Sequence, residues 1–247
     1  GFVKMRLDVG EFKKVQEEVR EVTNGIVIDF ESFRDCYFPL IEHYVLDREK
    51  GGGGSYLIGI QGSPGIGKGV FSFLVESYLR LKGFRAEAFS IDDFYKTDRE
   101  RLEMGKGGNG FFGISRGMPG TFKLGDLREV VFRAREGKDF EVPEFDKALN
   151  SGRGDVSGIR FVRGRQDFII LEGWCVFIPV VSYEEFLEVV RGDKYAKKIF
   201  EGLGVSREDF EEVMKYVKEY QKLWEEFDNR TFLTGDVGLI KSWRVNK

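Results

Sequence analysis

A glycine-rich loop near residue 60 combines the residue types that bind a phosphate group. An apolar run that begins at Tyr56 leads into Gly62, and after four further residues the chain continues with Gly67 and Lys68. Glycine allows the backbone to wrap tightly around an anion, because a Cβ atom would obstruct the angles that this requires. Successive N–H groups can then surround the β-phosphate of a nucleotide, while the lysine reaches the β- and γ-phosphate oxygens. The spacing therefore predicts a phosphate-binding loop, or P-loop.

A helix is expected directly after this loop, because apolar residues from Phe71 to Tyr78 recur on one helical face. The positive end of its dipole would then lie under the phosphates. A surface turn that carries a lysine by chance is the alternative, but a strand and a helix in the right order favour phosphate binding. The predicted nucleotide-binding residues are Gly62, Ser63, Pro64, Gly65, Ile66, Gly67, Lys68, Gly69 and Val70.

Residue 69 departs from the usual P-loop. A serine or threonine normally follows the lysine and offers its hydroxyl to Mg²⁺, whereas here Gly69 and Val70 follow Lys68. The predicted magnesium shell therefore lacks its usual hydroxyl ligand, which weakens the case for catalysis more than the case for nucleotide binding.

Carboxylates follow two further predicted strands. Residues 84–91 should form a strand that leads into Asp92 and Asp93, and residues 167–171 should form a buried strand that leads into Glu172. Phosphoryl transfer needs a base near the acceptor hydroxyl, a magnesium shell and mobile cations. Asp92 and Asp93 could accept the hydroxyl proton and orient the acceptor, while Glu172 fits the position that organises Mg²⁺ through water. The alternative role for a single strand-end carboxylate is to cap the next helix.

The strands and helices alternate, which predicts an α/β fold of three layers: a mainly parallel sheet with helices on both faces, as in P-loop NTPases. Ligands of such sheets gather at the carboxyl ends of the strands. We expect an N-terminal helical elaboration over residues 1–50, an engineered or flexible linker over residues 51–55 and a kinase-like P-loop domain over residues 56–247. The glycine-rich residues 105–113 could form a lid or an inconsequential solvent loop.

Composition narrows the function further. The 247 residues are 41% hydrophobic and 33% charged, and the formal net charge is −3, so no basic field would attract nucleic acid. Cys36 and Cys175 lie far apart, and His43 is the sole histidine, so a disulfide framework, a thiolate zinc site and Ser-His-Asp chemistry are not expected. No segment reads as a secretion signal or a membrane span, and we expect a cytoplasmic protein.

Ordered motifs recur over most of the chain, from about Leu57 to Arg244. They are Ser90-Ile-Asp-Asp-Phe-Tyr95, Arg116-Gly-Met-Pro-Gly-Thr121, Pro143-Glu-Phe-Asp-Lys147, Gly152-Arg-Gly-Asp155, Leu171-Glu-Gly-Trp174 and Trp243-Arg244. These motifs resemble those of D-glycerate 3-kinases and their fungal P-loop relatives. The wider uridine kinase, phosphoribulokinase and pantothenate kinase group is also similar, because its strand-end aspartate is followed by an aromatic residue.

The resemblance implies a kinase that moves the γ-phosphate of ATP, with Mg²⁺, to a hydroxyl of a small glycerate-like acid. Lys68, Asp92, Asp93, Glu172 and Arg116 would then be the catalytic residues. The acceptor would be bound by Asp92, Tyr95, Arg116, Lys147 and Arg153, and the metal by Asp92 and Glu172. For each cation, the alternative is a solvated charge or a structural ion pair.

One motif differs from the relatives, which continue Gly-Thr-His-Asp where this chain has Gly120-Thr-Phe-Lys123. If the missing pair touches the acceptor, the chain phosphorylates another molecule. Two alternatives therefore stay open: a nucleoside- or pantothenate-type kinase, and an ATP-binding regulatory protein that has lost the transfer reaction.

Overall fold

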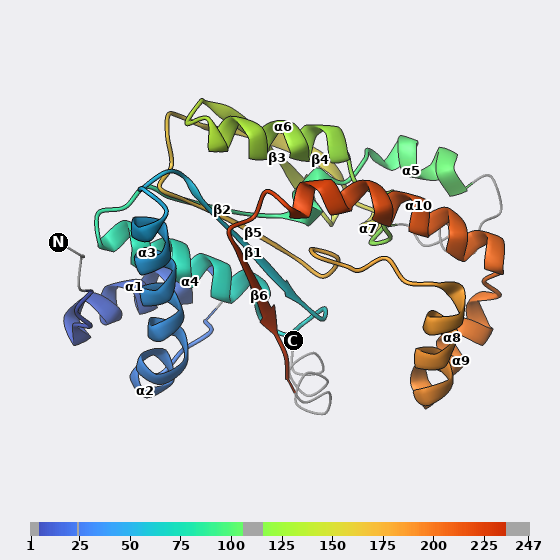
Figure 1. Cartoon of the computed structure of the whole chain (residues 1–247), viewed down its shortest axis with the longest axis horizontal. Helices are drawn as coiled ribbons and strands as arrows, with labels where there is room; N and C mark the ends of the chain where they lie inside the picture. Colours follow the sequence, from blue (N-terminus) through green and yellow to red (C-terminus); the bar gives the residue numbers. More distant parts are fainter. Residues whose placement is uncertain (1–4, 24, 106–115, 236–247) are drawn as a thin grey trace.

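A central parallel sheet separates two layers of helices in the computed structural model, which describes residues 5–23, 25–105 and 116–235 (Figure 1). The strands are β1 Tyr56–Gly62, β2 Ala86–Ser90, β3 Phe140–Asp146, β4 Asp155–Val162, β5 Phe168–Gly173 and β6 Asn229–Leu233. The helices are α1 Val9–Val22, α2 Phe30–Ser32, α3 Phe38–Lys50, α4 Lys68–Leu81, α5 Asp98–Gly105, α6 Leu124–Arg135, α7 Leu149–Gly152, α8 Tyr183–Gly192, α9 Lys194–Leu203 and α10 Arg207–Trp224.

The central sheet has the order β2-β5-β1-β6, and its described pairings are all parallel. Strand β5 lies between β2 and β1, so Glu172 is opposite Ile60 on one side and Ser90 on the other. The two central strands, β1 and β5, begin as continuous buried apolar runs, as expected for parallel strands that are covered on both faces. The carboxyl ends of β1, β5 and β2 place the P-loop, Glu172 and the segment after Ser90 at one edge of the sheet.

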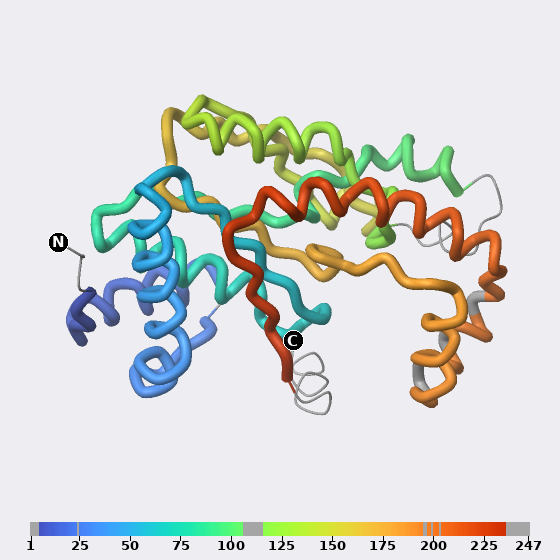
Figure 2. The backbone as a smooth tube through the Cα atoms, viewed as in Figure 1, coloured from blue at the N-terminus to red at the C-terminus, as the bar shows by residue number. Residues whose placement is uncertain are grey.

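The N-terminal helices cover one face of the sheet together with α4 (Figure 2). Phe12 and Val19 of α1 and Ile41 of α3 share one buried cluster with Ile58 of β1 and Leu74 of α4. The N-terminal segment is therefore packed as part of this layer.

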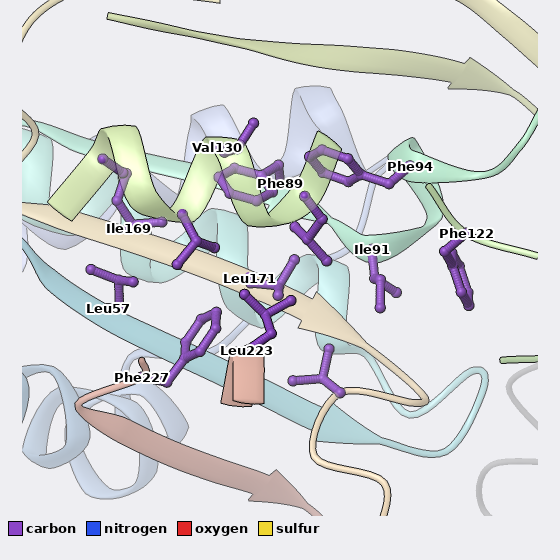
Figure 3. Packing of buried hydrophobic residues seen from close by; sticks show 14 of the residues in the cluster. Leu57, Phe89, Ile91, Phe94, Phe122, Val130, Ile169, Leu171, Leu223 and Phe227 are labelled. Carbon is purple, nitrogen blue, oxygen red and sulfur yellow. The ribbon is translucent and has the colours of Figure 1, made fainter. Parts of the chain in front are cut away.

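Helices α6 and α10 and the antiparallel β3–β4 hairpin cover the opposite face. Figure 3 shows the core of this layer, where Leu57 and Leu171 of the sheet meet Val130 of α6 and Leu223 of α10. The predicted α/β fold with helices on both faces of a mainly parallel sheet is confirmed.

The expected elements differ from the observed ones mainly at their ends. In the predicted helical elaboration over residues 1–50, the part after α1 is divided into α2, a π-helical turn over Phe33–Tyr37 and α3. The carbonyls of Gly53 and Gly54 in the glycine-rich segment accept hydrogen bonds from Arg48. Most of the glycine-rich loop over residues 105–113, and the motif Trp243-Arg244, lie outside the described residues.

Candidate active site

The P-loop connects β1 to α4 as the sequence predicts. Gly65 and Gly67 have φ angles of 87° and 97°, in the left-handed region that side chains with a Cβ rarely adopt. Gly67 is the N-cap of α4, and no side chain caps this helix end. The N-terminal N–H groups of α4 are therefore available to an anion.

Lys68 opens α4, and its side chain folds back over the loop. The Nζ atom donates a hydrogen bond to the carbonyl oxygen of Ser63 at 3.2 Å, and the residue is 9% exposed. Burial lowers the pKa of Lys68, while the carboxylates of Glu172 and Asp92 act in the opposite direction. The ammonium group therefore lies in a partly desolvated place, where its attraction to a phosphate is stronger than in water.

Asp92 lies in a 3₁₀ turn, Ile91–Phe94, directly after β2. The Ser90 hydroxyl caps this turn by accepting a hydrogen bond from the Asp92 N–H at 3.2 Å. The side chain of Asp92 forms an ion pair with Lys147, whose Nζ atom lies 2.7 Å from Oδ2. Lys147 is 55 positions away in the sequence, so the fold brings these two predicted site residues together.

Asp93 turns toward the backbone. Its Oδ2 atom accepts a hydrogen bond from the N–H of Ser90 at 3.0 Å, which completes a capping box. Burial raises the pKa of Asp93 to about 6, although hydrogen bonds from the backbone of Ser90 and Phe145 oppose the shift. Asp93 thus ties the end of β2 to β3 and fixes the turn that carries Asp92.

Glu172 lies at the end of β5, between the P-loop strand and β2. Burial raises the pKa of Glu172, and a hydrogen bond from Ser90 and the charge of Lys68 oppose this. A Cβ atom added at Gly69 would lie 4.0 Å from Oε1 of Glu172. The Glu172 carboxylate therefore faces the helix position where a P-loop usually carries its magnesium-binding hydroxyl.

These residues fit a nucleotide-bound Mg²⁺ ion. Within the described ranges, no group of three or more His, Cys, Asp or Glu residues could hold a metal by itself. Mg²⁺ does not need such a cage, because it keeps several waters and is usually bound by one or two carboxylates together with substrate phosphates. Glu172 and Asp92 can supply those carboxylates.

Tyr95 ends the turn that carries Asp92, and its ring is packed against other aromatic rings. Its ring stacks on Phe122 at a centroid distance of 4.5 Å and meets Phe145 at 5.0 Å. Burial raises the pKa of Tyr95, and the neighbouring charge of Asp92 and a hydrogen bond to it add to the shift. Phe122 is 3% exposed and thus belongs to the packing next to the site.

Of the other two predicted acceptor-binding cations, Arg116 bonds the tip of the β3–β4 hairpin, whereas Arg153 lies in that tip and bonds Asp98 of α5. Arg116 donates from Nη1 to the Gly152 carbonyl at 2.6 Å. Arg153 forms a two-pronged contact with Asp98, at 2.9 Å from Nε and 2.8 Å from Nη2. Lys147 is the member of this predicted trio that contacts Asp92.

Sequence reasoning missed Ser90, Asp98 and Arg101 as parts of this region. Ser90 directly precedes the aspartate pair, and its capping role could have been found from the Ser-x-x-Asp spacing. Asp98 and Arg101 gave no comparable signal, because their partners lie far away in the sequence.

Comparisons with known proteins find kinases similar to this chain. The chain is 29% identical over 206 residues to "Uncharacterized kinase mug58" of Schizosaccharomyces pombe, with 79% of this chain and 70% of that protein covered. It is 29% identical over 148 residues to the chloroplastic D-glycerate 3-kinase of Arabidopsis thaliana, covering 54% of this chain but only 32% of that protein. The resemblance to P-loop kinases is confirmed.

The fold comparison agrees. The solved structure of a D-glycerate 3-kinase from Cryptococcus neoformans superposes with a TM-score of 0.67 at 24% identity, over 78% of this chain and 68% of that one. No family model matches the chain. The names of the relatives support the conclusion that this chain is a kinase.

In the described part of the chain, no helix has the length and apolar character that a membrane crossing requires.

Proposed function

We propose that this chain is an ATP-dependent kinase that transfers the γ-phosphate to a hydroxyl of a small, glycerate-like organic acid. The observation that carries the proposal is the convergence of Lys68, Asp92, Glu172 and Lys147 at one sheet edge, with Lys147 on Asp92 at 2.7 Å. The names of two relatives, both D-glycerate 3-kinases, support the acceptor class.

Each group has a separate task in this proposal. The P-loop N–H groups and Lys68 bind the phosphates, and Asp92 accepts the proton of the attacking hydroxyl. Lys147 lies beside Asp92 and is placed to neutralise charge on the acceptor or on the transferring phosphate. Glu172 and Asp92 would hold Mg²⁺, which supplies charge neutralisation at the phosphate oxygens.

The surroundings of Phe122 and Lys123 are compatible with a glycerate-like acceptor. Phe122 is buried against Tyr95, and Lys123 lies 3.7 Å from Glu100. Both substituted positions therefore have structural partners, so the loss of the relatives' His-Asp pair does not by itself require another acceptor. The cytoplasmic location expected from the sequence stays a prediction.

The test is release of ADP by the full chain with Mg²⁺·ATP and a panel of hydroxy acids, nucleosides and pantothenate. We expect turnover with a hydroxy acid and a loss of about 10²- to 10⁴-fold in kcat for Asp92→Asn, with ADP binding retained. Asp126→Asn, at an exposed position of α6, is the matched control and should keep its turnover. Full turnover of Asp92→Asn would refute the role of the base.

The panel also separates the alternatives. Preference for a nucleoside or for pantothenate would assign the chain to the wider kinase group. The absence of a hydroxyl at Gly69 favours a second candidate, a regulatory ATP-binding protein, because direct magnesium ligation is weakened. Tight ATP binding without ADP release on any acceptor would favour that candidate.

A further inference from the structure

Arg101 of α5 is a buried cation whose acceptors come from separate parts of the chain. The residue is 4% exposed, and its Nη2 atom donates to the carbonyls of Arg153 and Gly154, each at 2.7 Å. Its Nη1 atom donates to the carbonyl of Lys96. A buried guanidinium needs such acceptors, because an unpaired buried charge is strongly unfavourable. Arg101 therefore joins the segment after Asp92 to the β3–β4 hairpin.

The hairpin tip that Arg101 holds also carries Lys147. Residues 147–154 connect β3 to β4, and the flanking residues Asp146 and Asp155 are register partners. Lys147 opens this connection, whereas the two carbonyls bound by Arg101 close it. The guanidinium of Arg153 in turn forms an ion pair with Asp98. Helix α5 therefore holds the tip in two ways, because Arg101 donates to the backbone of the tip and Asp98 accepts from its Arg153 side chain.

A second set of contacts runs through aromatic rings. The guanidinium carbon of Arg101 lies 5.1 Å from the ring centroid of Phe145 and 5.9 Å from that of Tyr95. Phe145 precedes Lys147 by two residues, and the backbone N–H of Tyr95 donates to the carbonyl of Asp92 at 3.4 Å. Arg101 thus contacts the immediate supports of both members of the Lys147–Asp92 pair.

We propose that Arg101 is a positioning residue that sets the Lys147 ammonium group against Asp92 for phosphoryl transfer. The proposal rests on the proposed kinase function. Arg101 acts through the hairpin tip and the two rings, and its planar fork reaches acceptors in different directions. A lysine carries its three N–H donors on one nitrogen, so it can bind some of these acceptors but not all of them at once.

The experiment compares Arg101→Lys and Arg101→Met with Arg48→Met in the full chain. Arg48 is a matched control, because its side chain is 11% exposed and donates to the carbonyls of Gly54 and Asp167 at 2.9 and 3.1 Å. Gly54 and Asp167 precede β1 and β5, so these contacts lie at the amino ends of the strands, opposite the candidate site. We measure kcat and KM with the acceptor identified by the panel, the Kd for ADP by calorimetry, and backbone hydrogen exchange over residues 146–156.

Both Arg101 variants should lose about 10²-fold in kcat, because small misplacements of reacting groups have effects of this size. Their ADP affinity should stay within about twofold of the wild type, since the P-loop is untouched. Exchange over residues 146–156 should become faster. Arg48→Met should show wild-type kcat and unchanged exchange in that segment.

Normal kcat in the Arg101 variants together with faster exchange would overturn the proposal, because Arg101 would then be structural only. Unchanged exchange would overturn the anchoring itself, and an equal kcat loss in Arg48→Met would show a general effect of destabilisation. If Arg101→Met does not fold, Arg101→Lys decides these outcomes. A wild-type chain without turnover on any acceptor would instead contradict the proposed function, and this result does not depend on the variants.

Discussion

The ion pair between Lys147 and Asp92 defines how an acceptor can approach the proposed base. The Nζ atom of Lys147 lies 2.7 Å from Oδ2 of Asp92, and 57% of the Lys147 side chain is exposed. An incoming hydroxyl must therefore use the other carboxylate oxygen or displace the ammonium group. Because Lys147 is exposed, the ion pair itself contributes little stability, which leaves the lysine free to follow the charge of a bound substrate.

Gly69 is the residue where the chain departs most from other P-loops, and its replacement is predicted to restore a metal ligand. The site has room, because the nearest atom to an added Cβ is Oε1 of Glu172 at 4.0 Å. In Gly69→Ser, the hydroxyl should tighten Mg²⁺-dependent ADP binding by roughly tenfold, the usual scale for a change around a metal site. Calorimetry with and without Mg²⁺ measures this.

Gly69→Ala is the control for that prediction, because alanine also improves the helix by about 1 kcal/mol without adding a ligand. Equal Mg²⁺ dependence in the serine and alanine variants would show that this position does not face the metal.

Asp93 should make the stability of the protein depend on pH. Burial raises the pKa of its carboxyl group to about 6 from the ordinary value of 3.8, so the folded state holds a proton that the unfolded state releases. The contribution is fully present below about pH 4 and is lost as the pH rises through about 6. Compared with Asp93→Asn, which keeps an acceptor oxygen, the wild type should lose unfolding free energy between pH 4 and 7.

Denaturant unfolding of both proteins across this pH range measures the difference. Parallel stability curves for the wild type and Asp93→Asn would contradict the assignment of a raised pKa to Asp93.

The sequence was sufficient to locate the P-loop, Asp92 and Glu172, because local spacing and strand ends determine them. It was insufficient for the partners of the cations. Arg153 and Asp98 are 55 positions apart, as are Lys147 and Asp92, and Arg116 bonds a carbonyl rather than a side chain. Such pairings follow from the path of the hairpin tip, which no local pattern specifies.

Among the elements, the β3–β4 hairpin contributes most to the site beyond the P-loop and the strand ends. The parallel alternation of strands and helices gave no indication of this antiparallel pair. Its inner residues Phe140, Val142 and Val162 join the core of the α6 layer, so the hairpin is fixed at its base while its tip delivers Lys147.

The N-terminal helices form a second element whose role can be tested. Phe33 is 0% exposed, and its ring lies 4.9 Å from that of Phe12 and 5.1 Å from that of Tyr78 in the P-loop helix. Phe33→Ala should lower the unfolding free energy by about 3 to 5 kcal/mol, because it leaves a cavity in the core. Denaturant unfolding should still show one transition, since the N-terminal helices and the sheet share this cluster.

Val22→Ala is the control, because Val22 is 61% exposed and such surface changes usually fall within about 0.5 kcal/mol. A similar small loss in Phe33→Ala, or two separate transitions, would mean that the N-terminal segment folds independently of the P-loop domain.

At the scale of the whole molecule, the fold accounts for the position of the site. A parallel sheet with both faces covered by helices leaves the carboxyl ends of its strands accessible, and this chain places its lysine and carboxylates there. The order β2-β5-β1-β6 puts Glu172 between the P-loop strand and the strand that leads to Asp92. Because the formal net charge is −3, the chain as a whole does not attract an anionic ligand, and the P-loop N–H groups, Lys68 and Lys147 have to supply that attraction locally.

The most direct test of the account is a crystal structure of the chain with Mg²⁺ and a non-hydrolysable ATP analogue. We predict that the β- and γ-phosphates lie on the backbone amides before Lys68, that the lysine amine leaves the Ser63 carbonyl for a phosphate oxygen, and that Asp92 and Glu172 face the γ-phosphate. A nucleotide bound elsewhere, or a γ-phosphate turned away from Asp92, would contradict the account.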